Sequence, residues 1–129
     1  MEAHTRACVA YVAARLVSGQ DASEIFDHSS ATSMRMSGTV QADRIDVLDH
    51  QRGCQFAGSS DGKVFDLEDH GATGHVELTM YGNRFEGFDA GSQSHFFGEV
   101  HHTAVSLFDV GDSGYFHYSL PATNDKLAT

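Results

Sequence analysis

The chain has few of the residues that mark several common classes of protein. Its 129 residues include two cysteines, one proline and no tryptophan, and its 8 Lys and Arg residues are outnumbered by 18 Asp and Glu residues, for a net charge of -10. A nucleic-acid partner is not expected, because binding to phosphates needs clustered basic side chains. Cys8 and Cys54 lie in different predicted elements and form no Cys-x-x-Cys motif, so we interpret them as free thiols.

Long apolar runs are also missing. The apolar stretch 7–14 follows Glu2, ends at Arg15 and has no convincing cleavage site after it. Neither a signal peptide nor a membrane span is expected, and we predict a cytoplasmic protein with no membrane partner. A chain of this length is expected to form one domain, residues 1–129.

An internal repeat organises most of the chain. Asp27, Asp49, Asp69, Asp89 and Asp109 follow one another at intervals of 22, 20, 20 and 20 residues, each directly after a short apolar run. A second apolar run follows each Asp, so each unit of about 20 residues consists of two short strands. The sequence therefore predicts five β repeats over 23–120, with a helix over 4–18 before them and a polar tail over 121–129 after them.

The predicted helix has a narrow apolar stripe. Val9, Val12 and Leu16 recur at helical spacing, and Gly19 is a typical residue after a helix end. Such a short helix is not stable alone in water. We therefore expect it to lie against the strands.

Two arrangements of about ten strands fit the repeat. One is an antiparallel meander that closes as a barrel or folds over, and the alternative is a β-solenoid with two strands per coil. A solenoid would stack acidic side chains at the neighbouring-strand spacing of about 4.8 Å, where like charges repel. We therefore favour the meander and a mainly β fold, although the meander also sets Asp66 opposite Glu77.

Glycine supports the meander through its position in the predicted turns. Thirteen glycines recur at fixed offsets, and glycine at the first of two loop residues is typical of type II′ hairpins. On one edge of the sheet this predicts two-residue loops at Gly62-Lys63 and Gly82-Asn83. On the other edge it predicts them at Gly71-Ala72, Gly91-Ser92 and Gly111-Asp112.

The regular Asp column suggests either a row of calcium ligands or a set of turn caps. Asp69, Asp89 and Asp109 are each followed two residues later by glycine. A short carboxylate in that place accepts hydrogen bonds from backbone N–H groups of the turn. Turn capping is therefore the interpretation that we favour.

Nine histidines leave metal binding open as an alternative function. The candidates are His75, His95 and His117, since zinc needs three or four N, O or S ligands. The meander separates His75 from His95 by two strands and sets Glu68 opposite His75. We interpret Glu68 and His75 as a cross-strand pair contributing roughly 0.2 to 1 kcal/mol, and we predict no cofactor apart from this metal alternative.

No motif predicts an enzyme. Gly58-Ser59-Ser60-Asp61-Gly62 matches Gly-x-Ser-x-Gly, but a nucleophile elbow needs a strand followed by a helix, and here a strand follows at Val64. Ser94 and His95 are adjacent in a strand and point to opposite faces.

The outward aromatic residues are the clearest functional signal. In the meander Phe97 lies opposite Phe108, Phe108 opposite Tyr115, and Phe88 beside them opposite His95. Such a cluster needs an explanation, whereas single exposed apolar residues do not. Two explanations stay open: the apolar stripe of the helix covers the patch, or the patch binds another copy of the chain or a protein partner.

The sequence thus resembles no family that we can name, and it predicts a non-catalytic β-repeat module that self-associates as a homo-oligomer or binds a protein partner. An alternative is a barrel that binds a small apolar ligand, because inward glycines would leave room inside. The same room would also admit phenylalanine rings or the helix as a plug. These glycines are Gly38, Gly58, Gly87 and Gly98.

Overall fold

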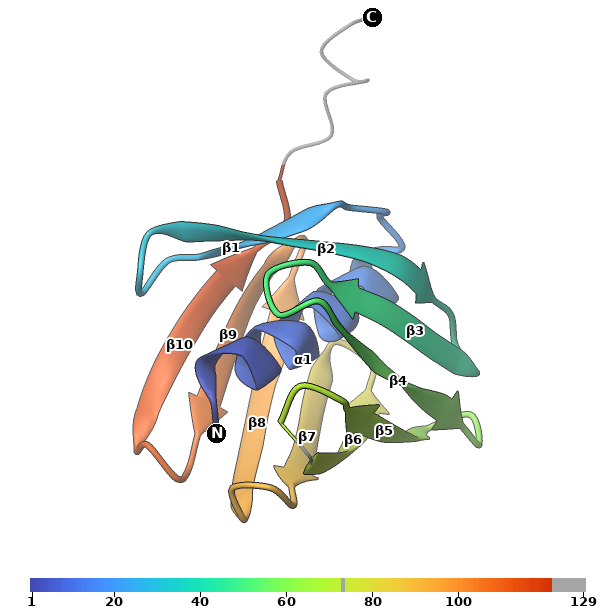
Figure 1. The fold of residues 1–129 in the computed structure, drawn as a ribbon. Coiled ribbons are helices and arrows are strands. Elements are labelled where there is room, and N and C mark those ends of the chain that lie inside the picture. The colour runs from blue at the N-terminus through green and yellow to red at the C-terminus, as the bar shows by residue number, and fades with distance from the viewer. Residues whose placement is uncertain (73, 122–129) are drawn as a thin grey trace, which may run out of the picture.

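The computed structural model describes residues 1–72 and 74–121, and they form a closed barrel of ten antiparallel strands around one helix (Figure 1). Each strand pairs with the next one along the chain, and the last strand pairs with the first. The predicted meander is confirmed, and the alternative solenoid is wrong. Residues 122–129 of the predicted tail lie outside the described residues.

The helix α1 is Ala3–Ser18, close to the predicted range 4–18. The strands are β1 (Glu24–Asp27), β2 (Thr32–Val40), β3 (Arg44–Asp49), β4 (Cys54–Ser60), β5 (Val64–Asp69), β6 (Gly74–Tyr81), β7 (Arg84–Asp89), β8 (Ser94–His101), β9 (Ala104–Asp109) and β10 (Gly114–Ser119). Within the described residues, no helix combines the length and the apolar character needed to cross a membrane.

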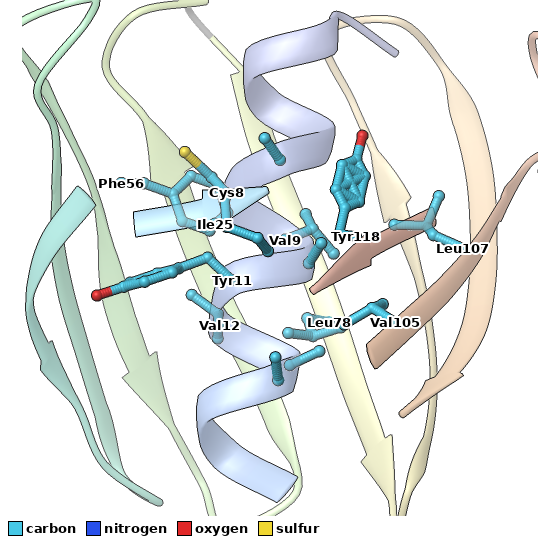
Figure 2. Close-up of a cluster of buried hydrophobic side chains, with 14 of the residues drawn as sticks. Cys8, Val9, Tyr11, Val12, Ile25, Phe56, Leu78, Val105, Leu107 and Tyr118 are labelled. Carbon is cyan, nitrogen blue, oxygen red and sulfur yellow. The ribbon is translucent and has the colours of Figure 1, made fainter. Parts of the chain in front are cut away.

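Helix α1 fills the interior of the barrel. A barrel of eight strands is just wide enough for its own side chains, so ten strands enclose additional room. Every residue from Ala7 to Ala14 is fully buried, and Figure 2 shows Val9 and Val12 among side chains of several strands. Tyr118 and Leu107 come from one side of the barrel wall and Phe56 from another.

The expectation of a narrow apolar stripe on the helix is wrong. Alanine occupies positions 7, 10, 13 and 14, and these small side chains make the helix apolar on every side. A helix that is apolar all round belongs in a core. Its position inside the barrel also means that the stripe of Val9, Val12 and Leu16 does not cover the outer aromatic residues.

Two inward glycines make room for aromatic rings from the neighbouring strand. Phe85 lies opposite Gly98, and Phe96 lies opposite Gly87, in the register of β7 and β8. A Cβ atom on Gly98 would lie 2.7 Å from Cζ of Phe85, which is too close for a real contact. The space that the glycines vacate therefore belongs to the packed core.

The two ends of the barrel have different turns. At one end, Tyr81 pairs with Arg84, and Gly82 begins a two-residue loop with φ of 64°, as predicted. At the other end, four residues separate Asp89 from its partner Ser94.

The predicted two-residue loops at Gly71-Ala72, Gly91-Ser92 and Gly111-Asp112 are therefore wrong, since each has four residues between the paired ends. The aspartate before the loop explains the wider turn, because its Oδ1 atom accepts the N–H of the glycine two residues later. The N···O distance is 3.3 Å for Gly91 and 3.0 Å for Gly111. Positive φ then falls on the last loop residue, Gln93 or Ser113, instead of the glycine.

Candidate interaction surface

Four aromatic side chains form a patch on the outer face of β7 to β10, and we call them the aromatic patch: Phe88, Phe97, Phe108 and Tyr115. Phe97 pairs with Phe108 and Phe108 with Tyr115, which is the predicted register. The rings of Phe97 and Phe108 stack with their centroids 5.2 Å apart, and Tyr115 meets Phe108 edge-on at 4.9 Å. Phe88 lies at the side of this group, 4.7 Å from the ring of His95.

The aromatic patch lies open on the barrel surface. Phe97 is 45% exposed and Tyr115 is 59% exposed, while Phe88 and Phe108 are half-buried. Helix α1 is inside the barrel and covers none of them. Of the two explanations that the sequence leaves open, the intramolecular one is therefore wrong.

Carboxylates are unevenly distributed around the patch. Across the outward positions of β8, β9 and β10, which are fully described, Glu99 is the only carboxylate. On the other side of the patch, Glu86 of β7 lies opposite Phe97 and Glu77 of β6 lies opposite Phe88. The least acidic part of this surface is therefore its β8 to β10 side.

The three candidate metal ligands have separate partners. His75 Nε2 contacts the Asp66 carboxylate, and His117 Nδ1 lies 3.1 Å from the Ser106 hydroxyl. His95 packs on Phe88, as described above. Among residues 1–72 and 74–121, no three His, Cys, Asp or Glu side chains are grouped in a way that could hold a metal ion.

The expected pairing of His75 with Glu68 is replaced by a diagonal one. Glu68 does lie opposite His75, but the imidazole Nε2 of His75 contacts the Asp66 carboxylate. Asp66 itself lies directly opposite Glu77. Glu68 instead has His70 at 3.9 Å.

The repeat aspartates cap turns, as predicted. Asp27 Oδ1 accepts the N–H of Ser29 at 2.8 Å, and Asp49 Oδ1 accepts the N–H of Gln51 at 3.0 Å, with the same pattern in the later repeats. All five are buried at the end of the barrel where α1 begins: Asp27, Asp49, Asp69, Asp89 and Asp109.

Side chains of the chain itself fill the space between several of these carboxylates. Arg52 Nε donates to Asp49 Oδ2 at 2.7 Å, and Arg52 also reaches Asp69. The hydroxyl of Thr5 on the helix donates to Asp69 as well. Sequence reasoning missed these partners, because nothing in the spacing of Thr5 or Arg52 relates them to the Asp column.

The two cysteines do not form a reactive centre. Both are free thiols; Cys8 is buried and Cys54 is partly buried. Burial raises the pKa of both thiols. Since the thiolate is the nucleophile, a raised pKa makes each cysteine less reactive at neutral pH.

The structure also agrees with the rejection of the serine motifs. Ser60 ends strand β4, and strand β5 follows it after a short loop, without a helix. Ser94 is buried and His95 is exposed, on opposite faces of β8. The aromatic patch is therefore the feature that most needs a functional explanation. The chain matched no protein-family model, no curated protein and no solved structure in the comparisons.

Proposed function

We propose that the protein is a non-catalytic β-barrel module that self-associates through the aromatic patch. One observation carries the proposal: the helix that could have covered the patch lies inside the barrel, and Phe97 and Tyr115 remain exposed. Clustered exposed aromatic side chains are typical of interaction surfaces.

The closed barrel restricts how another chain can bind. Strand addition needs a free sheet edge, and the strands β1 to β10 pair all the way round. The contact must therefore be made by side chains on an outer face. Large aromatic rings supply most of the binding energy in contacts of that kind.

Charge favours a second copy as the occupant. Two copies with a net charge of -10 each repel one another, and the repulsion is smallest when their least acidic faces meet. Strands β8 to β10, which carry Phe97, Phe108 and Tyr115, form such a face, with Glu99 as their one outward carboxylate. Arg84 and Glu99 lie opposite each other at its rim, so a two-fold contact lets Arg84 of one copy approach Glu99 of the other.

The alternative of an apolar ligand inside the barrel has less support. Helix α1 occupies the interior, with Val9 and Val12 fully buried against the barrel wall. A ligand of any size would have to displace the helix. The metal alternative lacks a cluster of ligands in the described part of the chain.

The first prediction concerns the mass of the protein in solution. Light scattering of untagged wild-type protein is expected to give a discrete oligomer, with metal content assayed on the same peak. The double variant Phe97→Glu and Phe108→Glu buries charge in the contact and should weaken association by at least about 100-fold, the effect of losing about 3 kcal/mol.

Leu48→Glu is the matched control. Leu48 is an apolar residue on the outer face of β3, away from the patch, and it is 38% exposed. This variant should keep the wild-type mass, and circular dichroism should show that all variants are folded. A wild-type mass of one chain at the highest soluble concentration, or an oligomer that survives the double substitution, would contradict the proposal.

A further inference from the structure

A hollow of about 600 Å³ on the outer surface overlaps the aromatic patch at Phe97 and Tyr115. Its volume falls within the range of small-molecule sites, about 300 to 1,000 Å³. The residues that the argument uses are Tyr81, Arg84, Glu86, Phe97, Glu99 and Tyr115. Sequence reasoning missed Tyr81 and Arg84, because they belong to different strands and neither lies in a recognisable motif.

The hollow is long. Tyr81 lies on β6 and Tyr115 on β10, so four strand spacings separate the two rings around the barrel. At about 4.8 Å per strand, the trough extends over roughly 15 to 19 Å. Its occupant is therefore an extended molecule.

The aromatic rings in the trough are held in position before any ligand binds. The Tyr81 hydroxyl donates to Glu86 Oε1 at 3.1 Å, and the ammonium of Lys63 lies 4.5 Å from the centre of the Tyr81 ring. Phe97 and Tyr115 are both fixed by Phe108, as described above. Groups that are already ordered lose little freedom on binding.

The polar groups of the trough indicate a neutral ligand with many hydroxyls. Glu86 and Glu99 accept hydrogen bonds, Arg84 donates them, and Ser106 does both. Arg84 and the Lys63 ammonium at the Tyr81 ring balance the two carboxylates, so the trough has no excess of positive charge to attract an anion. Glu86 already accepts from Tyr81, and Ser106 lies 3.1 Å from His117 Nδ1. These groups can form further hydrogen bonds with hydroxyls, which an apolar ligand does not offer.

Two other extended or aromatic-binding ligands fit less well. A peptide strand needs a free sheet edge for its backbone groups, and the barrel is closed. A quaternary ammonium ion needs aromatic rings closely around it, whereas here the rings are spread over several strands with Arg84 among them.

We propose that this trough binds a neutral oligosaccharide. The flat C–H faces of the sugar rings lie on Tyr81, Phe97 and Tyr115, and the sugar hydroxyls bond to Glu86, Glu99 and Arg84. The proposal does not require self-association, but Phe97 and Tyr115 belong to both surfaces, so a second copy and the sugar compete for them. Tyr81 lines the trough and lies outside the aromatic patch, whereas Phe88 belongs to the patch and does not line the trough.

The experiment titrates the full chain with cellohexaose, laminarihexaose, mannohexaose and an anionic hexagalacturonate, followed by amide NMR shifts and calorimetry. At least one neutral hexasaccharide should bind saturably and shift the signals of Tyr81 and Tyr115. Tyr81→Ala and Arg84→Ala should each weaken that binding by about tenfold or more, a loss of about 1.4 kcal/mol. Both side chains are exposed, and circular dichroism verifies that each variant is folded.

Phe88→Ser separates this proposal from the proposed function. It should weaken self-association. Measured on protein dilute enough to be dissociated, the affinity for the sugar should be the same in Phe88→Ser as in the wild type. Absence of saturable binding with all three neutral sugars at millimolar concentration would overturn the trough proposal. So would a preference for the anionic hexagalacturonate, or full affinity in Tyr81→Ala.

Discussion

Helix α1 carries an arginine near each of its ends, and the two arginines meet different surroundings. Near the start of the helix, Arg6 Nη1 lies 3.1 Å from Asp109 Oδ2, and Arg6 Nε donates to the Tyr118 hydroxyl at 3.2 Å. The Asp109 side chain is fully buried, and only 8% of the Arg6 side chain is exposed. Water therefore does little to screen this ion pair.

Near the end of the helix, the same three residue types meet again. Arg15 donates to the Tyr11 hydroxyl at 3.1 Å, and its Nη2 lies 3.0 Å from Asp21 Oδ1. Here the Asp21 side chain is 91% exposed. An exposed pair contributes little, while a buried charge that loses its partner costs several kcal/mol. The comparison indicates that the charges at the start of the helix fix it in the barrel.

The charged side chains at one end of the barrel explain why the start of the helix lies at that end. Strands β1, β3, β5, β7 and β9 all end on an aspartate at the end of the barrel where α1 starts. The start of a helix carries partial positive charge, which carboxylates stabilise. Arg6 and Arg52 add two full positive charges at the same end.

The largest expected effect at neutral pH is the loss of stability in Arg6→Met. The substitution keeps most of the volume but removes the guanidinium from buried Asp109, which keeps the Met1 ammonium at 3.2 Å. The free energy of unfolding should therefore fall by roughly 1.5 to 3 kcal/mol, the range for hydrogen bonds to a charged group. Arg15→Met loses hydrogen bonds and an exposed pair, and should cost only about 1 kcal/mol. Urea denaturation measures both values.

A double-mutant cycle tests whether the Asp109 carboxylate causes this difference. Asp109→Asn removes the charge, so adding Arg6→Met to it should cost clearly less than Arg6→Met costs alone. Equal losses from Arg6→Met and Arg15→Met in the wild-type background would refute the difference between the two ends.

The architecture was predictable from local pattern, and the position of the helix was not. Strand order, register and the outward aromatic residues follow from a period of two and a repeat of about 20 residues. The interior position of α1 follows from the room inside a ten-stranded barrel, which only closure creates. The pairing of Arg6 with Asp109 joins residues 103 positions apart, beyond any local signal.

The candidate surface was also predictable only in part. The aromatic patch was predictable, because its members lie on consecutive hairpins in a register that the turns determine. The trough also needs Tyr81, which lies four strands away from Tyr115, and no local pattern links these two residues. The exposure of the patch was not predictable either, because it depends on the burial of helix α1 inside the barrel.

A further loss of stability is expected at alkaline pH. It comes from Tyr118 and Tyr11, the tyrosines that contact Arg6 and Arg15 at the two ends of the helix. Burial raises the pKa of Tyr118 from 10.0 to about 12, with Arg6 acting in the opposite direction. Below pH 10 both the folded and the unfolded chain carry the neutral phenol, so the folded state has no penalty. As the pH rises from 10 through 12, the unfolded chain ionises first, and roughly 2 to 3 kcal/mol of stability is lost.

Tyr118→Phe should remove that part of the alkaline loss, at the cost of about 1 kcal/mol at neutral pH for the lost hydrogen bond with Arg6. Burial also raises the pKa of Tyr11, so Tyr11→Phe should reduce the remaining pH dependence. Urea unfolding between about pH 8 and about pH 12 compares the variants. If Tyr118→Phe loses as much stability at alkaline pH as the wild type does, then the burial of Tyr118 does not cause the loss.

The smallest expected effect concerns the exposed carboxylate of Asp21. Asp21→Asn removes the charge that faces Arg15, but Arg15 keeps its hydrogen bond to the Gly38 carbonyl at 2.8 Å and its bond to Tyr11. The free energy of unfolding should change by less than about 0.5 kcal/mol, and the change should vanish at about 1 M salt, where exposed charges are screened. Asp109→Asn, in contrast, should keep its full effect at high salt, because salt does not reach a buried pair. A large, salt-sensitive loss in Asp21→Asn would mean that the exposed end anchors the helix, since only an exposed pair responds to salt in that way.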